Sequence, residues 1–133
     1  MITLLDYGAG NVRSVINAIE SLGETVRIVA TAEDILTAEK LVFPGVGAFG
    51  NMMTILNRKA YAAPLKAYLA AGRPFLGICL GLHALFEGSE EAFAVEGLGV
   101  LKGTVKRFDI DRAVPHIGWN GISIRQPSKL FQG

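Results

Sequence analysis

Short apolar runs alternate, over the first 90 residues, with segments in which apolar residues recur at helical spacing. The runs predict buried strands, and the intervening segments predict amphipathic helices. Strands that alternate with helices predict an α/β fold with a parallel sheet covered on both faces. The predicted strands are 2–5, 25–29, 41–43 and 74–79, and the predicted helices are 12–22, a short one opened by a capping box of Thr31 and Asp34, 49–71 with a break near Pro64, and 82–87.

The pattern changes after Gly97, where short apolar stretches are separated by turn residues. Such a pattern predicts short strands in an antiparallel β extension, at 99–101, 104–108, 114–117 and 122–125. No internal repeat or linker divides the chain, so we expect one domain spanning 1–133.

Composition and charge narrow the possible functions. Half of the 133 residues are apolar, which is enough for one sizeable core, and the net charge is only +1. We therefore expect neither a nucleic-acid partner nor an anionic membrane partner. The longest uncharged stretch, 41–57, contains Pro44 and three glycines and is too short to span a bilayer. A single cysteine and a start without an export signal favour the cytoplasm.

Cys79 stands between Gly77 and Gly81, where a predicted strand meets a predicted helix. This is nucleophile-elbow spacing, in which a strained backbone exposes the reactive atom and side chains at the flanking positions would clash. The N–H of Leu80 is the expected donor to an oxyanion. The alternative is a small cysteine buried in a core strand.

Residues 44–50 contain G-x-G-x-x-G directly after a predicted strand, which is the spacing of a dinucleotide-binding loop. That motif requires an acidic residue about 20 positions later, yet no Asp or Glu lies between Glu39 and Glu87. We therefore favour a loop that supplies a second oxyanion donor to the cysteine. A glycine-rich turn without a ligand is the alternative.

Together with three further segments, these two loops resemble the glutamine amidotransferase subunits of imidazole glycerol phosphate synthase, a family of class I, triad-type glutaminases. The resemblance covers the chain nearly end to end, and its last segment separates this family from other class I amidotransferases. The matching segments are 6–11, 43–49, 74–81, 97–100 and 114–120.

The resemblance implies a flavodoxin-like, three-layer α/β fold and the hydrolysis of glutamine to glutamate and ammonia, without a cofactor or a metal ion. The ammonia would pass to a (β/α)8-barrel synthase (cyclase) subunit in a heterodimer of histidine biosynthesis. By position, Cys79 would be the nucleophile. The resemblance assigns oxyanion stabilisation to the backbone of Val46, Gly47 and Leu80. It assigns substrate binding to Gly45, His83 and Glu91, with Glu91 facing the α-ammonium group of glutamine. It assigns the synthase interface to Asn11, His116, Trp119 and Asn120.

The sequence departs from the family at two places. The His-Pro-Glu segment that completes the family's triad is not found here, so the resemblance implies a C-terminally truncated, incomplete domain with an unpaired sheet edge, prone to dimerise or aggregate. His83 stands where the family carries glutamine. It lies about one helical turn from Cys79, but a side chain on the same helix is poorly placed to act as the base. The alternative function is a non-catalytic fragment that retains partner docking.

Two of the interface residues have structural alternatives. For His116 we favour a hydrogen-bonded structural histidine over the interface role. We expect Trp119 to be partly exposed for a partner, and its alternative is a core tryptophan.

Overall fold

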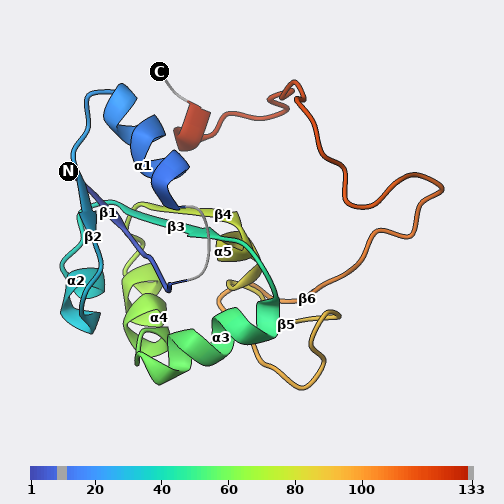
Figure 1. The fold of residues 1–133 in the computed structure, drawn as a ribbon, viewed down its shortest axis with the longest axis horizontal. Helices are drawn as coiled ribbons and strands as arrows, with labels where there is room; N and C mark the ends of the chain where they lie inside the picture. Colours follow the sequence, from blue (N-terminus) through green and yellow to red (C-terminus); the bar gives the residue numbers. More distant parts are fainter. Residues whose placement is uncertain (9–11, 132–133) are drawn as a thin grey trace.

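The computed structural model describes residues 1–8 and 12–131, and a four-stranded sheet forms its centre (Figure 1). The strands are β1 (Ile2–Leu4), β2 (Val26–Ile28), β3 (Leu41–Gly45) and β4 (Phe75–Cys79). They pair in parallel in the order β2-β1-β3-β4, which is the order of the flavodoxin-like fold. The four predicted strands and the predicted parallel sheet are confirmed.

Helices connect these strands as the pattern predicts. They are α1 (Val12–Ser21), α2 (Ala32–Leu36), α3 (Phe49–Arg58), α4 (Ala62–Ala70) and the single turn α5 (Leu80–His83). The break predicted within 49–71 falls at the α3–α4 junction, and Pro64 lies in the first turn of α4, where its missing N–H leaves no helical hydrogen bond unmade.

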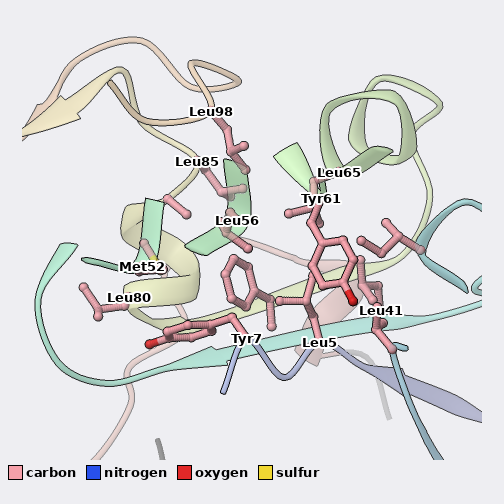
Figure 2. Packing of buried hydrophobic residues seen from close by; sticks show 14 of the residues in the cluster. Leu5, Tyr7, Leu41, Met52, Leu56, Tyr61, Leu65, Leu80, Leu85 and Leu98 are labelled. Carbon is pink, nitrogen blue, oxygen red and sulfur yellow. The ribbon is translucent and has the colours of Figure 1, made fainter. Parts of the chain in front are cut away.

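Alternate residues of β3 divide the core into two halves. Leu41 and Phe43 face a large cluster that includes buried side chains of α2, α3, α4 and α5, whereas Val42 faces a small cluster with α1. The sheet is therefore the middle of three layers, with α1 on one side and α2 to α5 on the other (Figure 1). Figure 2 shows the large cluster, in which Tyr7 and Leu80 lie at the end nearest α5.

The region after β4 differs from the prediction in two ways. The helix predicted at 82–87 begins at Leu80 and ends at His83. The N–H groups of Leu85 and Phe86 donate to carbonyls three residues back and not four, and the N–H of Glu87 donates to the carbonyl of Gly103 at 3.0 Å. The predicted antiparallel extension is wrong for the described residues. The strand pair found there joins β5 (Gly88–Ser89) to β6 (Thr104–Val105), and it is parallel.

Side-chain hydrogen bonds explain why the predicted strand at 104–108 stops early. The N–H of Arg107 donates to a carboxylate oxygen of Glu90 at 3.1 Å, so that backbone donor is satisfied without a partner strand. Residues 109–125 carry no strand and run outward as a long excursion, which returns to the 3-10 turn η1 (Lys129–Phe131) (Figure 1). Their apolar residues lack the neighbouring strand that this pattern needs to form a sheet.

The predicted open sheet edge is confirmed among the described residues. There, β4 pairs with β3 only, and its side chains Leu76 and Ile78 are exposed. Leu76 also lines a shallow apolar groove of about 180 Å³, together with residues that include Ile2 and Val42. No helix in the described part of the chain is both long and apolar enough to cross a membrane.

Candidate functional site

Three chain segments meet at the carboxyl ends of the parallel strands, the edge at which open α/β sheets bind their ligands. Tyr7 follows β1, the loop 45–47 follows β3, and Cys79 is the last residue of β4. The β3–β4 register sets Gly45 opposite Cys79. The fold therefore brings the two predicted motifs together.

Cys79 has the geometry of a nucleophile elbow. Its backbone adopts φ 55° and ψ −114°, a conformation that costs an L residue about 1 to 3 kcal/mol. A Cβ on Gly81 would overlap the carbonyl oxygen of Phe43, and one on Gly77 would lie 2.8 Å from the Gly81 backbone. Both flanking glycines are thus required for α5 to pack against β3 and β4. Because Cys79 is exposed, the alternative of a buried core cysteine is wrong.

The predicted oxyanion loop lies close to the elbow, and Tyr7 lies under it. A Cβ on Gly45 would lie 2.8 Å from Leu80 Cβ, so this glycine allows the loop to approach the elbow. The Tyr7 hydroxyl donates to the Val46 carbonyl at 2.7 Å, and the Val46 N–H donates to the same hydroxyl at 3.2 Å. The Val46 amide is therefore already hydrogen-bonded within the protein.

Tyr7 is a site residue that sequence reasoning missed, although it stands inside one of the matching segments. Burial is the main cause that raises its pKa above the ordinary value; the Val46 hydrogen bond opposes the increase, and the charges of Cys79 and Asp6 add to it. The available signal was its position two residues after a predicted strand, since the ends of neighbouring parallel strands lie side by side.

His83 and Glu91, both predicted to bind substrate, line one pocket of about 540 Å³. This volume lies within the usual range for small-molecule sites. Cys79 is not among the lining residues, so the thiol lies outside this pocket, which reaches α5 through His83. The remaining lining residues are Ser89, Glu90, Phe93, Val105, Lys106 and Arg107.

Glu91 has a structural role that the sequence did not reveal. Helix α3 begins after Ala48, which provides no side-chain cap, and a Glu91 carboxylate oxygen accepts the Phe49 N–H at 3.3 Å. The carboxylate thus satisfies a free amide at the start of the helix that follows the oxyanion loop. A carboxylate has about four acceptor positions, so this bond is compatible with a bound ammonium group.

Three of the predicted interface residues, His116, Trp119 and Asn120, belong to the excursion 109–125, which runs outward from the rest of the fold (Figure 1). Trp119 is 102% exposed, so its interpretation as a core residue is wrong. The His116 ring and the Asn120 side-chain amide share a hydrogen bond of 2.7 Å, which fits the structural alternative for His116 while leaving that side chain exposed. Asn11 lies outside the described residues.

A flavodoxin-like sheet with a cysteine elbow and a glycine loop at its carboxyl edge defines the class of protein. The model of the family described as glutamine amidotransferase class-I matches residues 3–133, and the chain belongs to this family. A solved structure described as a glutamine amidotransferase shares the fold, with a TM-score of 0.70 and 22% identity over 85% of this chain and 59% of that chain.

Within the family, the chain belongs with the subunits of imidazole glycerol phosphate synthase. It is 44% identical to subunit HisH of Syntrophotalea carbinolica, over 100% of this chain and 68% of the relative. It is 42% identical to HisH of Desulfitobacterium hafniense, over 100% of this chain and 63% of the relative. The chloroplastic hisHF protein of Arabidopsis thaliana is 53% identical over 98% of this chain and 22% of the relative.

The chain therefore spans 63% and 68% of the length of these two HisH relatives, and 22% of the length of the hisHF relative. The matched region includes both loops of the site, the predicted substrate residues and the predicted interface segment.

Proposed function

We propose that the chain carries the nucleophile of a glutaminase that hydrolyses glutamine to glutamate and ammonia for imidazole glycerol phosphate synthase. The observation that carries the proposal is the exposed Cys79 at a positive φ, on an elbow where Gly77 and Gly81 have no room for side chains. A strained backbone of this kind persists at functional sites because the surrounding packing holds it.

In the proposed reaction, the Cys79 thiolate attacks the carbonyl carbon of the glutamine side-chain amide. A carbon–sulfur bond forms, and the electron pair of the carbonyl moves to its oxygen, where N–H groups stabilise the charge. The proton that the thiol lost on forming the thiolate passes to the amide nitrogen, and the tetrahedral intermediate then expels ammonia and leaves a thioester. Water hydrolyses the thioester to glutamate and regenerates the thiol.

The oxyanion donors in this proposal are the backbone N–H of Leu80 and one from the loop formed by Gly45, Val46 and Gly47. Each such donor contributes roughly 3 to 4 kcal/mol in comparable enzymes. Leu80 follows the nucleophile directly, and Gly45 lies opposite Cys79 in the sheet register.

Substrate binding is assigned to the pocket that holds His83 and Glu91. The Glu91 carboxylate would accept from the α-ammonium group of glutamine, and the His83 ring would contact the substrate near the elbow. We assign His83 to binding and not to proton transfer, because it lines the pocket from the same turn that carries Cys79.

The partner in this proposal is a (β/α)8-barrel cyclase subunit, which uses the ammonia in histidine biosynthesis. The fusion of both parts in hisHF relatives from Arabidopsis thaliana and Schizosaccharomyces pombe supports such a partner. We assign docking to His116, Trp119, Asn120 and Asn11. The cytoplasmic location expected from the sequence stays a prediction, since the Arabidopsis relative is described as chloroplastic.

The test is covalent capture of Cys79 by a diazoketone analogue of glutamine. The sulfur bonds to the carbon that carries the diazo group, that carbon takes up the thiol proton, and dinitrogen leaves. We expect one adduct at Cys79, detected by peptide mass spectrometry, prevented by excess glutamine and absent in Cys79→Ser. Ammonia release in a mixture with a cyclase subunit and its nucleotide ligand is measured in parallel, with the same variant as the control.

The outcomes separate the two functions considered. Labelling that glutamine does not slow would show an accessible thiol without a glutamine site, and it would overturn the proposal. Intact binding to the cyclase, without labelling and without ammonia release, would instead establish the non-catalytic docking fragment.

A further inference from the structure

Tyr7 lies between the two loops of the candidate site without lining the substrate pocket. Its side chain is 2% exposed, and its ring meets the Phe43 ring edge-to-face, with 6.0 Å between the centroids. A Cβ on Gly45 would lie 3.3 Å from the Tyr7 hydroxyl. Figure 2 shows the ring reaching from the end of β1 toward Leu80, with the hydroxyl at its far end. The hydroxyl is therefore placed where the oxyanion loop meets the elbow.

This one hydroxyl holds two consecutive peptide groups of the loop. It accepts from the N–H of Val46, which belongs to the Gly45–Val46 peptide, and it donates to the Val46 carbonyl, which belongs to the Val46–Gly47 peptide. A tyrosine hydroxyl has one proton to donate and lone pairs to accept, so both bonds form together. The Tyr7 side chain thus sets the orientation of both peptide planes.

An oxyanion donor works only if its N–H points to the place where the negative charge develops. The Val46 N–H instead points to a buried hydroxyl. We infer that Tyr7 is a positioning residue whose two hydrogen bonds to Val46 form a latch. While these bonds are made, the Val46 N–H is not available to the oxyanion at Cys79, and it becomes available when they break. The inference rests on the proposed function, because the loop needs an oxyanion donor only if Cys79 attacks a carbonyl.

The loop has the freedom that such a latch requires. The Val46 side chain is 53% exposed, and a Cβ added to Gly47 would meet nothing within 4 Å. Gly47 also has φ +98°, a region in which glycine moves without steric cost. Rotation of the Val46–Gly47 peptide therefore meets little packing resistance, and it has to break the Tyr7 hydrogen bonds.

The test compares Tyr7→Phe with a matched control. Phenylalanine keeps the buried ring and removes only the hydroxyl. Tyr61→Phe makes the same chemical change at another buried tyrosine, whose hydroxyl donates to the Ala30 carbonyl at 3.0 Å in a different part of the core. The first measurement is hydrogen exchange at the Val46 amide, with circular dichroism melting to verify that both variants fold.

The second measurement is the ratio of two Cys79 alkylation rates. The diazoketone analogue of glutamine places a carbonyl oxygen at the oxyanion site, whereas iodoacetamide reports only how available the thiol is. We expect Tyr7→Phe to raise the Val46 exchange rate by about fivefold, the factor for the one neutral hydrogen bond that this N–H loses. The alkylation ratio should rise at least as much, because the Val46 carbonyl loses its hydrogen bond as well. Tyr61→Phe should change neither.

Unchanged Val46 exchange in folded Tyr7→Phe would overturn the latch. Faster exchange with an unchanged ratio would show that the hydroxyl only supports the loop, and it would overturn the positioning role. If the diazoketone labels neither the wild type nor the variants selectively, the proposed function fails. The Val46 exchange rates still decide in that case whether the latch exists, so the two failures are distinguishable.

Discussion

At the scale of the residue, the elbow depends on Gly77 and Gly81, where the packing leaves no room for a side chain. Cys79 keeps its positive φ because α5 follows at once and packs against β3. Gly81 makes that approach possible, since a Cβ there would overlap the Phe43 carbonyl oxygen. The packing of α5 against β3 therefore causes both the backbone strain at Cys79 and the close contact between Gly81 and Phe43.

Gly81→Ala should displace α5 from β3. Because the overlap is with backbone and not with the end of a flexible side chain, we expect a loss of about 3 kcal/mol in the free energy of unfolding, at the high end for an overpacked site. The measurement is urea denaturation. Gly121→Ala, where the added Cβ meets nothing within 4 Å, is the control and should stay within about 0.5 kcal/mol of the wild type. Equal stability of the two variants would contradict this account of the elbow.

At the scale of the element, the capping box of α2 is a local signal that the structure reproduces. The Thr31 side chain accepts from the Asp34 N–H, and an Asp34 carboxylate oxygen accepts the Thr31 N–H at 2.8 Å and the Ala30 N–H at 3.0 Å. The backbone hydrogen bond from Thr31 is the largest cause that lowers the pKa of Asp34, followed by that from Ala30.

A lowered pKa in the folded state means that Asp34 stabilises the fold above its unfolded pKa of about 3.9 and loses this contribution as the pH falls through the folded value. Asp34→Ala should therefore have a lower urea midpoint than the wild type at pH 7, and the two midpoints should converge as the pH falls below about 4. Midpoints that remain equally far apart down to pH 3 would show that the carboxylate charge is not what stabilises this turn.

Elements beyond β4 were predicted less well, for a physical reason. The capping box and the strands of the sheet are marked by residues close together in the sequence, whereas the pairing of β5 with β6 joins Ser89 to Val105. Apolar alternation in 109–125 predicts strands, but alternation specifies only a surface that can pack and does not provide the neighbouring strand. The Glu90 carboxylate also satisfies the Arg107 N–H, a backbone donor that the pattern assigned to a strand.

At the scale of the whole molecule, the excursion 109–125 is where stability and the proposed docking can be tested separately. Trp119 is completely exposed and contributes no buried area to the core. Trp119→Ala should therefore leave the free energy of unfolding within about 0.5 kcal/mol of the wild type. Its affinity for the cyclase should fall by about 30-fold, the effect of losing an aromatic interface residue worth about 2 kcal/mol.

Chemical denaturation and titration calorimetry measure these two quantities. Leu22→Ala provides the control, since Leu22 is 83% exposed but lies outside the excursion. A Trp119 variant that loses stability while each folded molecule binds the cyclase as before would reverse the assignment.

The sequence by itself determined the order of strands and helices up to β4, the elbow spacing around Cys79 and the family, because each depends on neighbouring residues or on matching segments. Only the tertiary structure decided which groups meet at the site. Tyr7 and Val46 are 39 positions apart, and Phe49 and Glu91 are 42 apart. Such contacts follow from the order in which parallel strands lie side by side. The conformational propensities of neighbouring residues do not specify that order.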